Sequence, residues 1–135
     1  MRIKELSYNE WRICSPIDDS VYLSQIELYL NEHCNDKGLN KLLASIERLS
    51  KLGPRGFTDL TVHEVDKVNK IYQLRKRDHR FLYFHGADRK LILVACPHRK
   101  SGSKVDPKQV SRAIRIKQQY YQSADARSIV FCKDE

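Results

Sequence analysis

The chain is organised around residues 70–100, KIYQLRKRDHRFLYFHGADRKLILVACPHRK. Residues 72–75 alternate apolar and polar side chains, which is the pattern of a strand with one buried face. A second strand is predicted over residues 80–84. Residues 91–96 are apolar without interruption, which indicates a strand buried on both faces. We therefore predict three adjacent strands, the last of which stops at Pro97 and is followed at once by cations.

The chain has 135 residues, enough for one domain with a single core, and we treat residues 1–135 as that domain. No run approaches the roughly 18 apolar residues that span a bilayer. The first residues, MRIKELSYNEW, lack the apolar core of a signal peptide. These features predict a cytoplasmic protein that does not contact a membrane.

The net charge of +8 is concentrated in one part of the chain. Residues 63–120 carry 15 Lys and Arg against 5 Asp and Glu, whereas residues 1–62 carry 8 against 9. A concentrated basic region favours a polyanionic partner, most often nucleic acid. A solvated face kept basic for solubility is the weaker explanation.

The four cysteines are far apart, and no CxxC pair is present, so the sequence indicates neither a disulfide framework nor a metal site. Cys96 and His98 could form half of a metal site, but no second ligand pair accompanies them. We expect no metal and no cofactor.

Two helices are predicted before the central stretch. The first begins at Asp19 or Ser20, either of which can cap a helix, and residues 35–38 end it. The second covers residues 39–52, with apolar side chains at i, i+3, i+4 and i+7, and Gly53 ends it. A connection this short predicts a helical hairpin with both apolar faces turned to one sheet.

After the central stretch, Asp106 caps a predicted helix that has Pro107 at its first position. Residues 128–132 are short and β-prone, and either add an edge strand or pack against the N-terminal segment. The predicted fold class is α+β: an N-terminal helical hairpin packed on a small, mostly antiparallel sheet, with a C-terminal helix.

The ordered set of motifs resembles the RelE/HigB superfamily of bacterial toxins, and is most similar to the HigB-like branch that includes phage-derived members. The residues that carry this resemblance are Tyr72, Leu74 and Arg75; Arg80 and Tyr83; Leu91 to Val94; Arg99 and Lys100; Ser101 to Lys104; Pro107; and Ala113 with Arg115. The resemblance covers about residues 20–122 and leaves residues 1–19 and 123–135 as extensions. Cys96-Pro97-His98 departs from the pattern, because an apolar or aromatic residue commonly precedes the cation pair.

The resemblance implies the toxin of a type II toxin–antitoxin system, an endoribonuclease that cleaves mRNA, often on the ribosome, and is silenced by a cognate antitoxin protein. Some proteins of this RelE/ParE fold inhibit gyrase or have lost activity, so fold alone does not decide the chemistry. The alternatives are therefore a non-catalytic binding protein of the same fold and a phage accessory protein that docks an acidic protein.

Metal-independent RNA cleavage uses the substrate's 2′-OH as nucleophile, and it needs a base, an acid and cations for the transition state. The basic region holds few carboxylates, which argues against a two-metal nuclease. Candidate catalytic residues are the histidines His98 and His63, the cations Arg75, Arg80, Arg99 and Lys100, and Tyr120. Candidate RNA-binding residues are Lys76, Arg77, Lys104, Arg112 and Arg115.

Several of these residues also have a purely structural explanation. His98 after a buried strand is equally well explained as a capping residue, and Arg75 as an ion-pair partner of Asp78 or Asp88. Tyr120 is expected to point outward and Tyr121 to follow the buried face of the helix.

Overall fold

The computed structural model describes residues 1–18, 20, 22–34, 36–57, 62–88, 90–100, 102 and 104–133. Strands and helices alternate in blocks along the chain. The strands are β1 (Arg2–Tyr8), β2 (Arg12–Asp18), β3 (Leu23–Ser24), β4 (Val62–Asp66), β5 (Ile71–Lys76), β6 (His79–His85), β7 (Leu91–Arg99) and β8 (Val130–Cys132). The helices are α1 (Gln25–Glu32), α2 (Lys37–Leu52) and α3 (Pro107–Asp125), with a short 3₁₀ turn, η1, at Pro54–Gly56.

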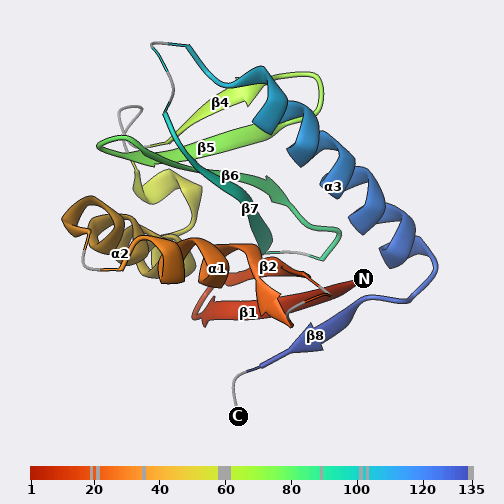
Figure 1. Ribbon diagram of the computed structural model, residues 1–135. Coiled ribbons are helices and arrows are strands. Elements are labelled where there is room, and N and C mark those ends of the chain that lie inside the picture. The colour runs from red at the N-terminus through yellow and green to blue at the C-terminus, as the bar shows by residue number, and fades with distance from the viewer. Residues whose placement is uncertain are drawn as a thin grey trace.

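The described strands form one mixed sheet in the order β4-β5-β6-β7-β2-β1-β8, and β3 pairs with β2 at one end (Figure 1). The three strands predicted over residues 70–100 are present as β5, β6 and β7, and they pair antiparallel. β2 lies parallel to β7, and β8 lies parallel to β1. The sheet is therefore larger and more mixed than the sequence predicted.

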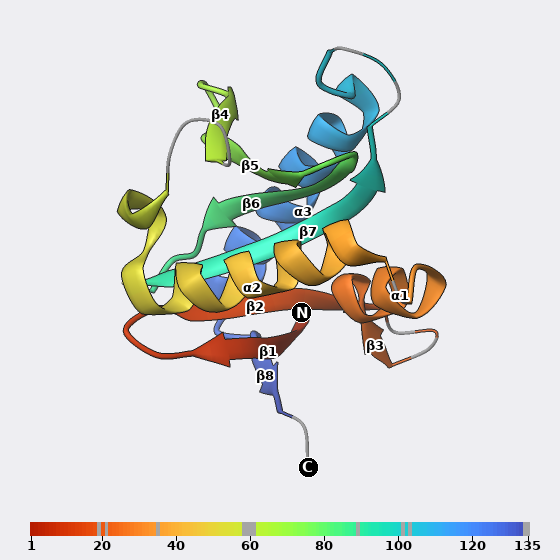
Figure 2. The same cartoon turned by 90° about the vertical axis from the view of Figure 1, so that its left-hand side faces the viewer.

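The sheet separates two layers of helix (Figure 2). Helices α1 and α2 pack on one face, and their core includes Ile26, Leu42, Phe81 and Val94. Helix α3 covers the other face, where its buried residues meet the opposite side chains of the same strands, such as Leu82. Each central strand thus alternates between two cores, which explains why β6 and β7 are apolar almost throughout.

The prediction of an N-terminal helical hairpin is wrong, because the chain begins with strands and the two helices follow them. Residues 2–18, which the resemblance leaves as an extension, form the β1–β2 hairpin next to β7. Pro16 lies in β2 beyond Cys14, where the pairing with β7 ends, so its missing N–H costs no bond to β7.

The first helix begins later than predicted. Ser24 is the N-cap of α1, and its hydroxyl accepts a hydrogen bond from the Glu27 backbone N–H at 3.2 Å. Ser20 precedes the helix, and Asp19 lies outside the described residues. α2 begins at Lys37 because the Asp36 carboxylate accepts from the backbone N–H groups of residues 38 and 39.

Strand β7 continues beyond Pro97 to Arg99, which the sequence did not predict, and it does so through a bulge. Arg80 pairs with His98 and Leu82 pairs with Ala95, so one residue of β6 faces two residues of β7. Cys96 adopts a φ of 52° there. Its backbone N–H, displaced from the ladder, donates instead to the Gln25 side chain on α1 at 2.9 Å. The bulge reverses the alternation of side chains for the rest of the strand.

Segments near the two ends of the chain pair at one edge of the sheet. The backbone N–H of Val130 donates to the Met1 carbonyl at 2.9 Å, and β8 then pairs with β1 over three residues. Residues 128–132 therefore add an edge strand next to the N-terminal segment. No helix in the described part of the chain is long and apolar enough to cross a membrane.

Candidate functional site

The candidate site lies on the α3 face of the sheet, beyond the N-terminus of that helix. Arg75 on β5, Arg80 on β6 and His98 on β7 form one row, because Arg75 pairs with Arg80 and Arg80 pairs with His98. Directly opposed side chains in such a row have Cβ atoms about 5 Å apart. Period-2 alternation places Gln73 on the same face as Arg75, next to His63 of β4.

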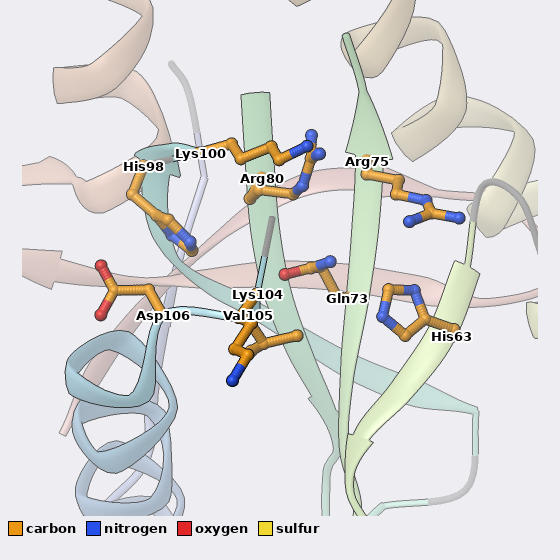
Figure 3. Close-up of a pocket in the computed structure, with 9 residues that line it drawn as sticks. All are labelled: His63, Gln73, Arg75, Arg80, His98, Lys100, Lys104, Val105 and Asp106. Atoms are coloured by element: carbon orange, nitrogen blue, oxygen red, sulfur yellow. The ribbon is translucent and has the colours of Figure 1, made fainter. Parts of the chain in front are cut away.

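These side chains surround a cavity of about 100 Å³. Its lining residues come from four strands and from the segment that leads into α3: His63, Gln73, Arg75, Arg80, His98, Lys100, Lys104, Val105 and Asp106 (Figure 3). A water occupies about 30 Å³ in the liquid, so the cavity has room for about three waters, the size of a phosphate group. A small cavity with this many cations suits an anionic group.

His98 is held in one orientation by the bulge. Its Nδ1 lies 2.7 Å from the Cys96 carbonyl oxygen, which can only accept, so the neutral ring carries its proton on Nδ1. Nε2 is then left as a hydrogen-bond acceptor. Burial lowers the pKa of His98, against the Cys96 hydrogen bond and the Asp106 charge, which raise it, while the Arg80 charge lowers it further. At neutral pH the ring is therefore uncharged, as a general base must be.

His63 lies on the far side of the cavity from His98, with Gln73 between them (Figure 3). Its Nδ1 is buried and has no hydrogen-bond partner among the described residues. Burial lowers the pKa of His63, and the charges of Arg75 and Arg80 lower it further. Gln73 is 3% exposed, so its amide is a buried polar group at the cavity floor. An unsatisfied buried polar atom in a polar cavity indicates a place for a ligand.

Arg80 is buried in the cavity wall and held by two backbone carbonyls. It is 8% exposed, and its Nη1 donates to the backbone carbonyls of Arg77 at 2.6 Å and His79 at 2.9 Å. Burial and the neighbouring Arg75 charge lower the pKa of Arg80. Two like charges directly opposite each other destabilise a sheet. An anion bound between Arg75 and Arg80 would offset that repulsion.

Arg99 and Lys100, predicted as a pair, are separated by the structure. Lys100 lines the cavity, and its side chain ends near the Arg80 guanidinium in Figure 3. Arg99 points to the opposite face of the sheet, where it pairs with Asp36 at 3.3 Å and with Asp78 at 3.2 Å. The bulge at Cys96 is the cause, since it places residues 98 and 100 on the face that carried residues 93 and 95.

Tyr120 lies in the core and does not line the cavity. Only 2% of Tyr120 is exposed, and its hydroxyl accepts from the Ala87 backbone N–H in the β6–β7 turn, at the other end of β6 from Arg80. The expectation that Tyr120 points outward is wrong. Tyr121, expected to be the buried one, is partly exposed and donates to the His85 carbonyl at 2.9 Å.

The residues predicted to bind RNA lie in three places. Lys104 lines the cavity, whereas Lys76 and Arg77 lie at the β5–β6 turn. Arg112 and Arg115 are exposed on α3 outside the cavity. Ser101 and Ser103, part of the basic loop that carries the resemblance, lie outside the described residues.

Sequence reasoning missed Gln73 and Asp106 as residues of the site. Gln73 had a usable signal, because it lies two residues before Arg75 on one strand and so shares its face. Asp106 was assigned only as a helix cap, and it does accept from the Lys108 backbone N–H at 2.9 Å. Asp106 also lies beside His98 at the cavity wall, because the packing of α3 against the sheet brings the start of that helix there.

Comparison with known proteins supports no family for this chain, since no family model and no curated protein sequence matches it. Among the described residues, no group of three or more His, Cys, Asp or Glu side chains is arranged to hold a metal ion. The interpretation of the site therefore rests on its own geometry.

Proposed function

We propose that this protein is an endoribonuclease that cleaves single-stranded RNA through the substrate's own 2′-OH. The observation that carries the proposal is the row Arg75–Arg80–His98, which places two cations and a neutral imidazole on one phosphate-sized cavity. The cations would hold the scissile phosphate and stabilise the charge of its transition state. The imidazole would act on the adjacent hydroxyl.

In this scheme Nε2 of His98 accepts the proton of the 2′-OH while that oxygen attacks the neighbouring phosphorus. The bond from phosphorus to the 5′-oxygen breaks, and the leaving oxygen takes up a proton. The products are a 2′,3′-cyclic phosphate and a 5′-hydroxyl. Arg80, held by two backbone carbonyls, meets the developing charge without having to reorganise.

His63 is the candidate acid for the leaving oxygen, because it faces the cavity from the side opposite His98. An in-line displacement needs its base and its acid on opposite sides of the phosphorus. His63 is neutral in the free protein, since burial and two arginines lower its pKa. A bound phosphate anion raises that pKa, so the substrate itself favours protonation of His63.

The biological setting is proposed from the resemblance alone. In that setting the protein is a cytoplasmic toxin of a type II toxin–antitoxin system that cleaves mRNA, on the ribosome or free, and a cognate antitoxin covers the basic face. A protein of the same fold that binds nucleic acid without cleaving it is the alternative. Cleavage by the purified protein separates the two.

The test uses purified protein and two matched single-stranded oligonucleotides, one all-RNA and one with a single 2′-deoxy substitution at the mapped cleavage site, with EDTA present. We expect the RNA to be cut to a 2′,3′-cyclic phosphate and a 5′-hydroxyl, and the deoxy strand to bind but stay intact. Cleavage of the deoxy strand, or a requirement for a divalent cation, would contradict the scheme. Binding without cleavage would leave the non-catalytic alternative.

The cellular arm of the test induces the wild type and the His98→Asn variant and maps mRNA 5′ ends. Growth arrest with new ends, lost in the variant, is the expected result. Arrest without new ends would contradict the ribonuclease and point to another target, such as gyrase. No arrest, from a folded protein that cleaves RNA in vitro, would reject the toxin setting.

A further inference from the structure

A second cluster of ionisable side chains lies on the opposite face of the sheet from the cavity, between α1, the start of α2 and the β5–β6 turn. We call it the turn clamp, and its members are Tyr29, Asp36, Asp78, His79 and Arg99. His79 is fully buried at its centre. The site described above uses none of these side chains.

The contacts within the turn clamp connect α1 and the start of α2 to the β5–β6 turn. The Tyr29 hydroxyl lies 2.6 Å from Nδ1 of His79, and Nε2 of His79 lies 3.1 Å from the Asp36 carboxylate, outside hydrogen-bond geometry. In the Nε2–H tautomer of His79, Nδ1 accepts a hydrogen bond from the Tyr29 hydroxyl. Arg99 then bridges Asp36 to Asp78 in the turn.

The backbone carbonyls of the β5–β6 turn accept hydrogen bonds from two cationic residues that line the cavity, Arg80 and Lys100. The carbonyls of Arg77 and His79 accept from the Arg80 guanidinium, and the carbonyl between them, that of Asp78, accepts from the Lys100 backbone N–H at 2.6 Å. Three consecutive carbonyls thus face Arg80 and Lys100, while the side chains of Asp78 and His79 are held by the clamp.

We propose that the turn clamp positions Arg80 and Lys100, so that loosening it slows RNA cleavage although no clamp side chain touches the RNA. This inference rests on the proposed function. A phosphate-binding cation displaced by about 1 Å costs up to about a hundredfold in rate. The clamp supplies the rigidity because its central imidazole is buried, hydrogen-bonded to Tyr29 on one side and in contact with the Asp36 carboxylate on the other. It also gives Arg99 a role as a positioning residue.

The test compares Tyr29→Phe and Asp36→Asn with a control. Tyr29→Phe removes only the hydroxyl that contacts His79. Asp36→Asn removes the charge shared by His79 and Arg99 but keeps an N-cap as good as Asp for α2. The control is Glu47→Gln on the exposed face of α2, whose carboxylate pairs with Lys51 at 3.3 Å. Cleavage kinetics and hydrogen exchange of the Lys100 amide are measured on each.

We expect both clamp variants to lower kcat about tenfold, to change KM less than about threefold, and to speed exchange of the Lys100 amide, whereas the control changes none of these. A clamp variant that keeps wild-type kcat, or slow Lys100 exchange, would overturn the inference. If the wild type cleaves no RNA, the proposed function fails and Lys100 exchange alone decides whether the clamp holds the turn.

Discussion

His98 and Arg99 are neighbours in the sequence, yet their side chains lie on opposite faces of the sheet. His98 lines the cavity with Arg80, while Arg99 pairs with Asp36 and Asp78 beneath it. A bulge at Cys96 decides which of the two faces the cavity. The two side chains therefore have different expected roles.

Substitution of these two neighbours should separate the roles. His98→Asn keeps a donor that can reach the Cys96 carbonyl but removes the Nε2 acceptor, so we expect cleavage to fall at least about a hundredfold with RNA affinity nearly unchanged. Arg99→Gln should cost no more than about tenfold, because Arg99 acts only through the turn. Single-turnover kinetics and filter binding measure both effects. Equal losses of cleavage in the two variants would refute the assignment of His98.

The bulge itself should be sensitive to one side chain of α1. Gln25→Leu removes the acceptor of the Cys96 backbone N–H and leaves that donor without its partner, at a cost of about 1–3 kcal/mol in the free energy of unfolding. Gln25→Glu keeps an acceptor oxygen and serves as the control. Urea denaturation measures both. An unchanged urea midpoint for Gln25→Leu would show that the bulge does not need this bond.

Stability should fall on mild acidification. Burial lowers the pKa of His63, His85 and His98 below the ordinary value of 6.5. As the pH falls from 6.5 towards the lower pKa values of the folded state, the unfolded chain binds more protons than the folded protein. The free energy of unfolding therefore decreases in that pH range, and it is fully present above pH 6.5. Urea unfolding at pH 7.5 and pH 5.5 checks the sign.

The histidine substitution provides the control for this pH dependence. His98→Asn removes one of the three groups, and we expect a smaller difference in unfolding free energy between the two pH values. A wild-type protein that is equally stable at both would contradict the burial of these rings.

Arg112 on α3 should affect RNA binding but not the chemical step. It is exposed on α3 outside the cavity, so we expect its charge to attract RNA without reaching the scissile phosphate. Arg112→Ala is expected to reduce the slope of log K against log salt by about 0.7, the value for one phosphate of a single strand, and to leave kcat unchanged. Lys133→Ala, an equal loss of charge on the distant edge of the sheet, is the control. A fall in kcat would place Arg112 in the catalytic machinery instead.

Local pattern was sufficient for much of the secondary structure. The alternation in residues 72–75 and the apolar run in residues 91–96 predicted strands that are present, and the apolar spacing of residues 39–52 predicted most of α2. These signals work because they depend on the residue's own neighbours along the chain. Within residues 2–18 the strand signal was weak and limited to Trp11 to Cys14, because β2 mixes Ser15 and Pro16 with apolar residues. The full strand depends on pairing with β1 and β7.

By itself the sequence determined that a basic region with histidines and arginines follows three strands, because charge and strand order are properties of the chain alone. Only the tertiary structure decided which of these side chains share a cavity. It brought His63, Arg75, Arg80 and His98 together from four strands, turned Arg99 away and buried Tyr120. The physical reason is that a side chain's face depends on register and bulges, and these are set by pairing between segments far apart in sequence.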